Sequence, residues 1–102
     1  MPLPPPLLTS LSFQPGSVAG TIVMQGEPTA RHANVRFYTF NRTGGDGVIT
    51  DAADDGSFTT SPFPAVAGDD IQLYFDTPGG ERSQELCTTV VFDSALVSSD
   101  CR

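Results

Sequence analysis

The chain has 102 residues, and 12 acidic side chains against five arginines give it a formal net charge of −7. A chain of this length forms one domain, and a hydrophobic content of 38% excludes general disorder. Five scattered arginines cannot make the basic face of a nucleic-acid-binding protein, and the absence of lysine excludes Schiff-base chemistry.

The N-terminal segment combines a proline-rich arm with a candidate strand. Residues 2–6 hold four prolines, which favour polyproline II or a disordered arm, and they lack the basic start of a signal peptide. Residues 7–13 alternate with the period of two that is typical of a half-buried strand. The large apolar side chains of this segment are Leu7, Leu8, Leu11 and Phe13.

Short strand signals, separated by turn clusters, follow along the rest of the chain, and helical periodicity is nearly absent. Strands are predicted over residues 17–24, 34–40, 48–50, 57–60, 71–76, 86–92 and 95–99. In the first of these, Val18, Ile22 and Met24 are expected to share one face. Residues 57–60 are expected to return antiparallel to the preceding strand, and the prolines at 62 and 64 exclude a central strand there.

The order of turn and strand elements between residues 16 and 83 resembles a known group of modules. The elements are GSVAG (16–20), GEP (26–28), ANV (33–35), TD and DDGSF (50–58), and AGD (67–69). This order is similar to carboxypeptidase regulatory-like, transthyretin-like and bacterial immunoglobulin-like modules, which are β-sandwiches of secreted and surface proteins. The resemblance covers about two thirds of the chain and implies a structural or binding module without catalysis of its own.

These signals together predict an all-β fold. We expect an antiparallel immunoglobulin-like or transthyretin-like sandwich of seven to eight strands. Residues 1–15 would form the arm and the first strand, and residues 16–102 the sandwich domain.

The two cysteines predict a disulfide. If the last turn centres on residues 93–95, Cys87 and Cys101 face each other across a hairpin. A bond between them would favour an oxidising location. The alternative is a pair of unrelated thiols, one buried and one at a frayed end.

Several aspartates in turns suggest a calcium site, because hard cations prefer clustered carboxylate oxygens. They are Asp51, Asp54, Asp55, Asp69 and Asp70. An EF-hand alignment fails, because Pro62 stands where the bidentate acid should be. A looser site requires the two loops to share one end of the sandwich, and solvation of ordinary turns is the alternative. No other cofactor is expected.

Three further features have both a functional and a structural interpretation. Residues 41–43 form an Asn-Arg-Thr glycosylation sequon in a loop expected to be exposed, although such tripeptides also arise by chance. His32 lacks identifiable catalytic partners and is expected at the surface. Tyr38, Phe40 and Tyr74 could form an outward interface or a sugar-stacking platform, but we favour core packing, since one bulge exchanges inside and outside.

The N-terminal strand has two possible partners. It can close its own sheet, which we favour, or add to the sheet of a neighbour and generate a filament. We therefore expect a non-catalytic structural or assembly subunit of an extracellular fibre, surface layer or virion, and not an enzyme. The alternative is a calcium- or carbohydrate-binding accessory module of a secreted protein.

The expected partners and location follow from the same reasoning. A homo-oligomer or a host protein assembly is expected, without nucleic acid. No apolar run reaches the 18 residues that a membrane span needs. The location would be extracellular or surface-exposed, as a secreted protein or part of a virion.

Overall fold

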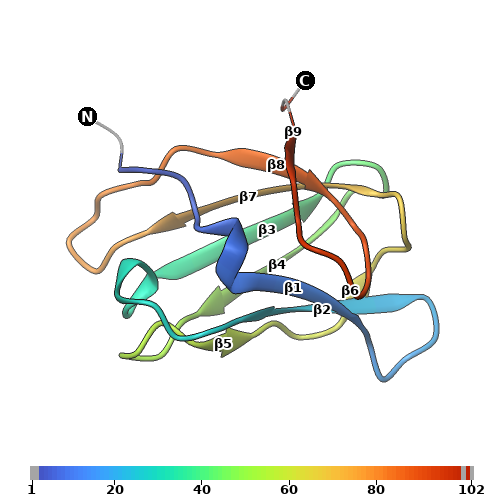
Figure 1. Cartoon of the computed structure of the whole chain (residues 1–102), viewed down its shortest axis with the longest axis horizontal. Coiled ribbons are helices and arrows are strands. Elements are labelled where there is room, and N and C mark those ends of the chain that lie inside the picture. The colour runs from blue at the N-terminus through green and yellow to red at the C-terminus, as the bar shows by residue number, and fades with distance from the viewer. Residues whose placement is uncertain (1–2, 100, 102) are drawn as a thin grey trace.

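The computed structural model describes residues 3–99 and 101, and in this part the chain is all-β with two short 3₁₀ turns (Figure 1). The 3₁₀ turns are η1 (Leu8–Ser10) and η2 (Ala30–His32). The strands are β1 (Leu11–Pro15), β2 (Thr21–Gly26), β3 (Arg36–Asn41), β4 (Asp46–Asp51), β5 (Phe58–Thr59), β6 (Phe63–Pro64), β7 (Asp70–Asp76), β8 (Leu86–Thr89) and β9 (Ser98–Ser99). None of the helical turns in this part has the length and apolar character of a membrane-spanning helix.

The strands form two antiparallel sheets. One sheet has the order β1-β2-β5, with β6 also pairing with β2, and the other has the order β4-β3-β7-β8-β9. The chain therefore crosses between sheets after β2, after β4 and after β6. We call the second sheet the five-stranded sheet, and the side that points away from the core its outer face.

The side chains between the two sheets form one hydrophobic core. Phe37 of the five-stranded sheet stacks on Phe58 of the other sheet, with ring centroids 4.4 Å apart. The core residues are Leu11, Phe13, Ile22, Met24, Val35, Phe37, Ala52, Phe58, Phe63, Ala65, Ile71, Leu73, Phe75, Val90 and Leu96. Both sheets contribute large side chains to this core.

The N-terminal strand lies in its own chain's sheet, but it is shorter than predicted. β1 pairs with β2 from Leu11 opposite Gly26 to Pro15 opposite Ile22. Leu11 and Phe13 are buried as expected, whereas Leu7 and Leu8 are only half-buried. The expected strand over residues 7–13 is wrong at its start, because the 3₁₀ turn η1 interrupts the alternation.

Two further boundaries differ from the predictions. The second strand begins at Thr21, and Val18, expected on the same face as Ile22 and Met24, is 60% exposed in the preceding turn, whereas those two residues are buried. Gly20 has φ +80° there, a conformation that suits glycine and ends the turn. The expected return of residues 57–60 beside the preceding strand is also wrong, since β5 crosses to the other sheet and pairs with β2.

The predicted strands 34–40 and 71–76 correspond to β3 and β7, although β3 begins only at Arg36, after a turn in which Asn34 has φ 58°, and these two strands set the outer face. β3 and β7 alternate buried and less buried residues along their length, and they pair with each other over six positions. Phe37 and Phe75 point into the core, and Tyr38 and Tyr74 consequently point outward.

Candidate functional site

The outer face of the five-stranded sheet carries a row of apolar and aromatic side chains at one level of the strands. Ile49 of β4 is the register partner of Tyr38 of β3, and Tyr38 is the partner of Tyr74 of β7. The two tyrosine rings stack with centroids 4.9 Å apart and an interplanar angle of 19°. Ile49 is 62% exposed. We call these three residues the aromatic row.

A second row, in which the charges alternate in sign, lies two residues further along the same strands and on the same face. Its members are register partners in the order Asp51, Arg36, Asp76 and Arg82, across β4, β3, β7 and the segment after β7. Arg36 Nε donates to Asp51 Oδ1 at 2.8 Å, and Arg82 binds both carboxylate oxygens of Asp76, at 2.7 and 3.0 Å. We call these four residues the charged row, and its signs read minus, plus, minus, plus.

The ion pairs in the charged row shift the pKa values of their members. The hydrogen bond from Arg36 lowers the pKa of Asp51, and the hydrogen bonds from Arg82 lower that of Asp76. The same contacts raise the pKa values of both arginines. All four groups therefore remain charged over the whole physiological range of pH.

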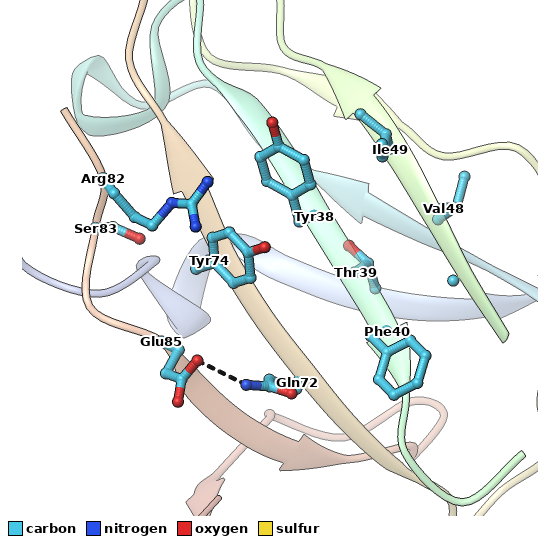
Figure 2. Close-up of a pocket in the computed structure, with 11 residues that line it drawn as sticks. Tyr38, Thr39, Phe40, Val48, Ile49, Gln72, Tyr74, Arg82, Ser83 and Glu85 are labelled. Atoms are coloured by element: carbon cyan, nitrogen blue, oxygen red, sulfur yellow. Dashed lines mark hydrogen bonds between the residues drawn. The ribbon is translucent and has the colours of Figure 1, made fainter. Parts of the chain in front are cut away.

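Arg82 connects the two rows. Its guanidinium carbon lies 4.7 Å from the ring centroid of Tyr74 and 5.7 Å from that of Tyr38, which is cation–π geometry. Figure 2 shows this guanidinium reaching toward the two stacked rings. The aromatic row is thus held in place from one side by a cation that is itself fixed by a carboxylate.

A groove opens beside the aromatic row. At the next level of the strands Gly47 is the partner of Phe40, which is 41% exposed, and the Phe40 ring packs against the backbone at position 47, where a side chain would crowd it. Gln72 donates to Glu85 at 2.7 Å on the other side (Figure 2). The hollow measures about 1010 Å³ and includes the aromatic row among its lining residues. It is mainly apolar with a polar rim, as binding surfaces commonly are.

The prediction that Tyr38, Phe40 and Tyr74 pack into the core is therefore wrong, because no bulge exchanges the faces of β3 and β7. Sequence reasoning missed Ile49 and Arg82. The alternation of β7 already indicates which of its residues point outward, but no local pattern shows that the turn after β7 returns Arg82 to Asp76.

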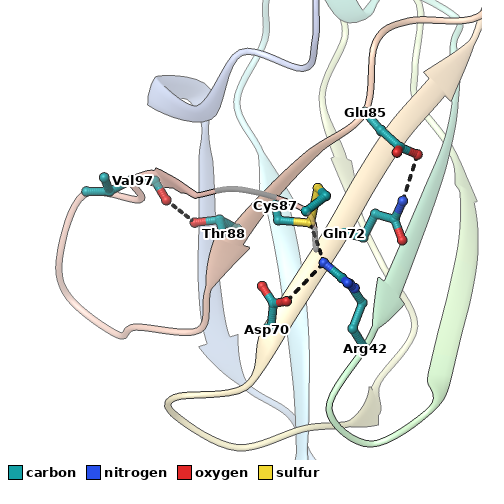
Figure 3. Close-up of a disulfide and its surroundings, with 8 residues drawn as sticks. Arg42, Asp70, Gln72, Glu85, Cys87, Thr88 and Val97 are labelled. Atoms are coloured by element: carbon teal, nitrogen blue, oxygen red, sulfur yellow. Dashed lines mark hydrogen bonds and ion pairs between the residues drawn. A yellow bond between two sulfur atoms is a disulfide. The ribbon is translucent and has the colours of Figure 1, made fainter.

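The predicted disulfide between Cys87 and Cys101 is confirmed (Figure 3). Cys87 of β8 is the register partner of Ser99, and Cys101 lies just beyond β9. Arg42 Nη1 lies 3.4 Å from Cys87 Sγ and 3.3 Å from Asp70 Oδ2. The disulfide therefore ties the end of the chain to the five-stranded sheet.

The aspartates considered for calcium lie at two different ends of the five-stranded sheet. Asp51 is opposite Arg36, at the start of β3, and it precedes the turn that holds Asp54 and Asp55. Asp69 and Asp70 lie beside the other end of β3. The described residues contain no group of three or more His, Cys, Asp or Glu placed to hold a metal ion. The structure therefore does not bring the five carboxylates together.

Asn41 of the sequon is a structural residue, and the expectation of an exposed loop is wrong at this position. Asn41 is only 1% exposed. The amide nitrogen donates to Pro64 O at 3.1 Å and to Asp69 Oδ2 at 2.9 Å. The amide oxygen accepts from the backbone nitrogens of Thr43 and Gly44, each at 3.0 Å. The amide thus organises the β3–β4 loop.

Replacing Asn41 by alanine should lower the free energy of unfolding by about 2 kcal/mol, because four partly buried hydrogen bonds lose one partner. Thr43→Ala also destroys the sequon but keeps the Asn41 amide, so it should cost less than half as much. Urea denaturation of both variants measures the difference. Equal losses in the two variants would show that the amide does not organise the loop.

His32 is fully buried, and the prediction of a surface histidine is wrong. Its Nε2 accepts a hydrogen bond from the backbone nitrogen of Leu7 at 3.1 Å, and its ring meets Phe37 and Phe75 edge-on. Burial, aided by the charge of Arg31, lowers its pKa to about 4. Nδ1 has no hydrogen-bond partner among the residues that the structure describes. The histidine anchors the N-terminal segment and lies away from the aromatic row.

Comparisons of the chain with protein-family models, with curated proteins and with solved structures found no match.

Proposed function

We propose that the chain is a non-catalytic assembly module that docks another protein surface on the outer face of its five-stranded sheet. The observation that carries this proposal is the aromatic row with Arg82 stacked on it. Tyrosine and arginine are enriched at the energetic centres of protein interfaces, and exposed apolar patches with polar rims mark interaction sites.

The proposal includes an immunoglobulin-like or transthyretin-like sandwich as the scaffold. Its support is the strand order, in which β3 and β4 join one sheet while β2 before them and β5 after them join the other. Such crossings are typical of Greek-key sandwiches. A rigid scaffold of this kind suits docking, because little entropy is lost when a preformed face binds.

The proposed setting is an extracellular fibre, surface layer or virion. The disulfide between Cys87 and Cys101 supports an oxidising location, since such bonds are rare in reducing compartments. The N-terminal strand is not needed for the proposal. β1 pairs within its own sheet, so the outer face takes the docking role considered for that strand.

Carbohydrate binding is the second candidate, favoured by the flat tyrosine pair. Sugar rings stack on such aromatic faces, and the adjacent Gln72 and Glu85 could bind hydroxyl groups. Arg36 and Arg82 of this face are already paired with the two aspartates of the charged row, which suits a neutral ligand.

Sedimentation velocity over a range of concentrations tests the docking function. The wild-type chain should sediment faster as its concentration rises from micromolar to millimolar, because its outer face binds the surface of another copy of the chain. Tyr38→Ser should abolish the change. Val97→Ser is the matched control, since Val97 is 74% exposed but lies outside the outer groove, and it should behave like the wild type.

An NMR titration with a panel of oligosaccharides separates the two candidates. Amide shifts at Tyr38 and Tyr74 on addition of a sugar, together with a wild-type chain that stays monomeric at all concentrations, would replace the assembly function by carbohydrate binding. No shift with any sugar, together with concentration-dependent sedimentation, is the result expected here.

A further inference from the structure

The order of signs in the charged row has a consequence for self-association. Read from β4 toward the segment after β7, the row is Asp51, Arg36, Asp76, Arg82, or minus, plus, minus, plus. Read in the opposite direction, it is plus, minus, plus, minus. The row is therefore complementary to its own reverse, and a second copy can present that reverse.

A two-fold axis can place a second copy so that it presents the reversed row. This axis runs parallel to the strands, lies in the plane of the outer face and passes between β3 and β7. Such an axis reverses the order of the strands but keeps each level along them. The charged row then meets the charged row end for end. By register position, Asp51 lies opposite Arg82 of the second copy, and Arg36 lies opposite Asp76 of the second copy.

The same axis brings the apolar groups together. Tyr38 lies opposite Tyr74 of the second copy, so that two stacked tyrosine pairs meet at the centre of the contact. Sheets packed face to face keep their strands within about 30° of each other, which preserves this matching of levels. The contact has an aromatic centre and a charged border, the usual anatomy of a protein interface.

The members of the charged row are accessible for such a contact. The side chains of Arg36, Asp51 and Arg82 are 56%, 67% and 59% exposed, while that of Asp76 is 23% exposed. Each arginine uses only part of its five donors in its own chain, and a guanidinium can bind a second carboxylate. Pairing across two copies therefore adds to the existing ion pairs without breaking them.

We propose that the outer face is a self-complementary interface, and that the docking partner is a second copy of this chain related by a two-fold axis along the strands. The inference deepens the assembly function and rests on it. It also specifies that the unit of assembly is an isologous dimer, in which the same patch is used twice.

Exchanging the two members of one ion pair tests the inference sharply. The variant Arg36→Asp with Asp51→Arg keeps the ion pair within the chain and the net charge of −7. Its charged row reads plus, minus, minus, plus, which is the same in both directions and places like charges opposite each other. The dimer dissociation constant should rise more than about tenfold at low ionic strength.

The second exchange, Asp76→Arg with Arg82→Asp, gives the row minus, plus, plus, minus and should impair self-association in the same way. An equimolar mixture of the two exchanged variants should form a heterodimer, because the two rows are complementary to each other. A variant with both exchanges reads plus, minus, plus, minus and should dimerise more tightly than either single exchange, although less tightly than the wild type because Arg82 no longer contacts the tyrosine rings. Formation of the heterodimer also shows that both variants fold.

The possible results distinguish the inference from the proposed function. If the sedimentation coefficient of the wild type rises with concentration and neither single exchange changes that rise, the two-fold arrangement is overturned. This result leaves docking on the outer face in place. A wild type that is monomeric at millimolar concentration overturns both. The expected result is that each single exchange weakens dimerisation. The equimolar mixture and the variant with both exchanges should then dimerise more tightly than either single exchange alone.

Discussion

Lowering the pH from 7 to 4 should reduce the free energy of unfolding by about 3 kcal/mol through His32 alone. The folded chain buries this imidazole and lowers its pKa from 6.5 to about 4, so between these values the unfolded chain binds more protons. Stability is therefore complete above pH 6.5 and is lost as the pH falls toward 4. Protonation of Nε2 would also remove the acceptor for the backbone nitrogen of Leu7.

His32→Gln provides the control, because glutamine keeps a hydrogen-bond acceptor but does not titrate. Its stability should change little between pH 6.5 and 4.5, although it starts below that of the wild type. The carboxylates of Asp51, Asp55 and Asp76 do not confuse the measurement. Their pKa values are lowered from 3.8, so their contributions are lost only at more acidic pH. If urea denaturation gives the same pH dependence of stability for the wild type and for His32→Gln, then His32 is not the group that titrates between pH 6.5 and 4.

Removing the disulfide should also cost about 3 kcal/mol, the chain-entropy value for a closed loop of this length. Cys87 and Cys101 are 14 residues apart in sequence, and the bond restricts the unfolded chain more than the folded one. The double variant Cys87→Ala with Cys101→Ala should unfold at a correspondingly lower urea concentration. This loss would make the chain much less stable in a reducing compartment.

Chemical reduction of the wild type is the matched control for the double variant, since it leaves both side chains in place. It should produce a loss of similar size. If oxidised and reduced wild-type chains unfold at the same urea concentration, the disulfide does not stabilise the fold, and it gives no support for an extracellular location.

The central strands of the five-stranded sheet could be predicted from the sequence because their pattern is strictly local. Residues 71–76 alternate apolar and polar side chains without a glycine or proline, and β7 follows this alternation. The disulfide could be predicted for a similar reason, since a short hairpin brings its ends together whatever the rest of the fold does.

The predictions were wrong where the local sequence of a short segment does not favour one position in the fold over another. Residues 57–60 show the same alternation in a hairpin as in a crossing, and only contacts with distant parts of the chain distinguish them: Phe58 packs on Phe37, and β5 pairs with β2. His32 resembles a surface residue because its neighbours are polar. Its ring packs on Phe37 and Phe75, and its Nε2 accepts a hydrogen bond from Leu7, 25 residues earlier in the chain.

The candidate site was only half visible in the sequence for the same reason. The outward position of Tyr38 and Tyr74 follows from their alternation with core residues, once no bulge intervenes. The charged row requires the register of three strands and the turn after β7. Register is set by tertiary packing, and a shift of one residue would reverse the faces.

A dilution series followed by amide NMR spectra tests the central claim most directly, because it reports which residues leave an interface. If the chain assembles through its outer face, the shifts should be concentrated at Tyr38, Ile49, Tyr74 and Arg82, and those of the β1–β2 hairpin should stay constant. Spectra that do not change with concentration, or changes confined to β1 and β2, would contradict the account.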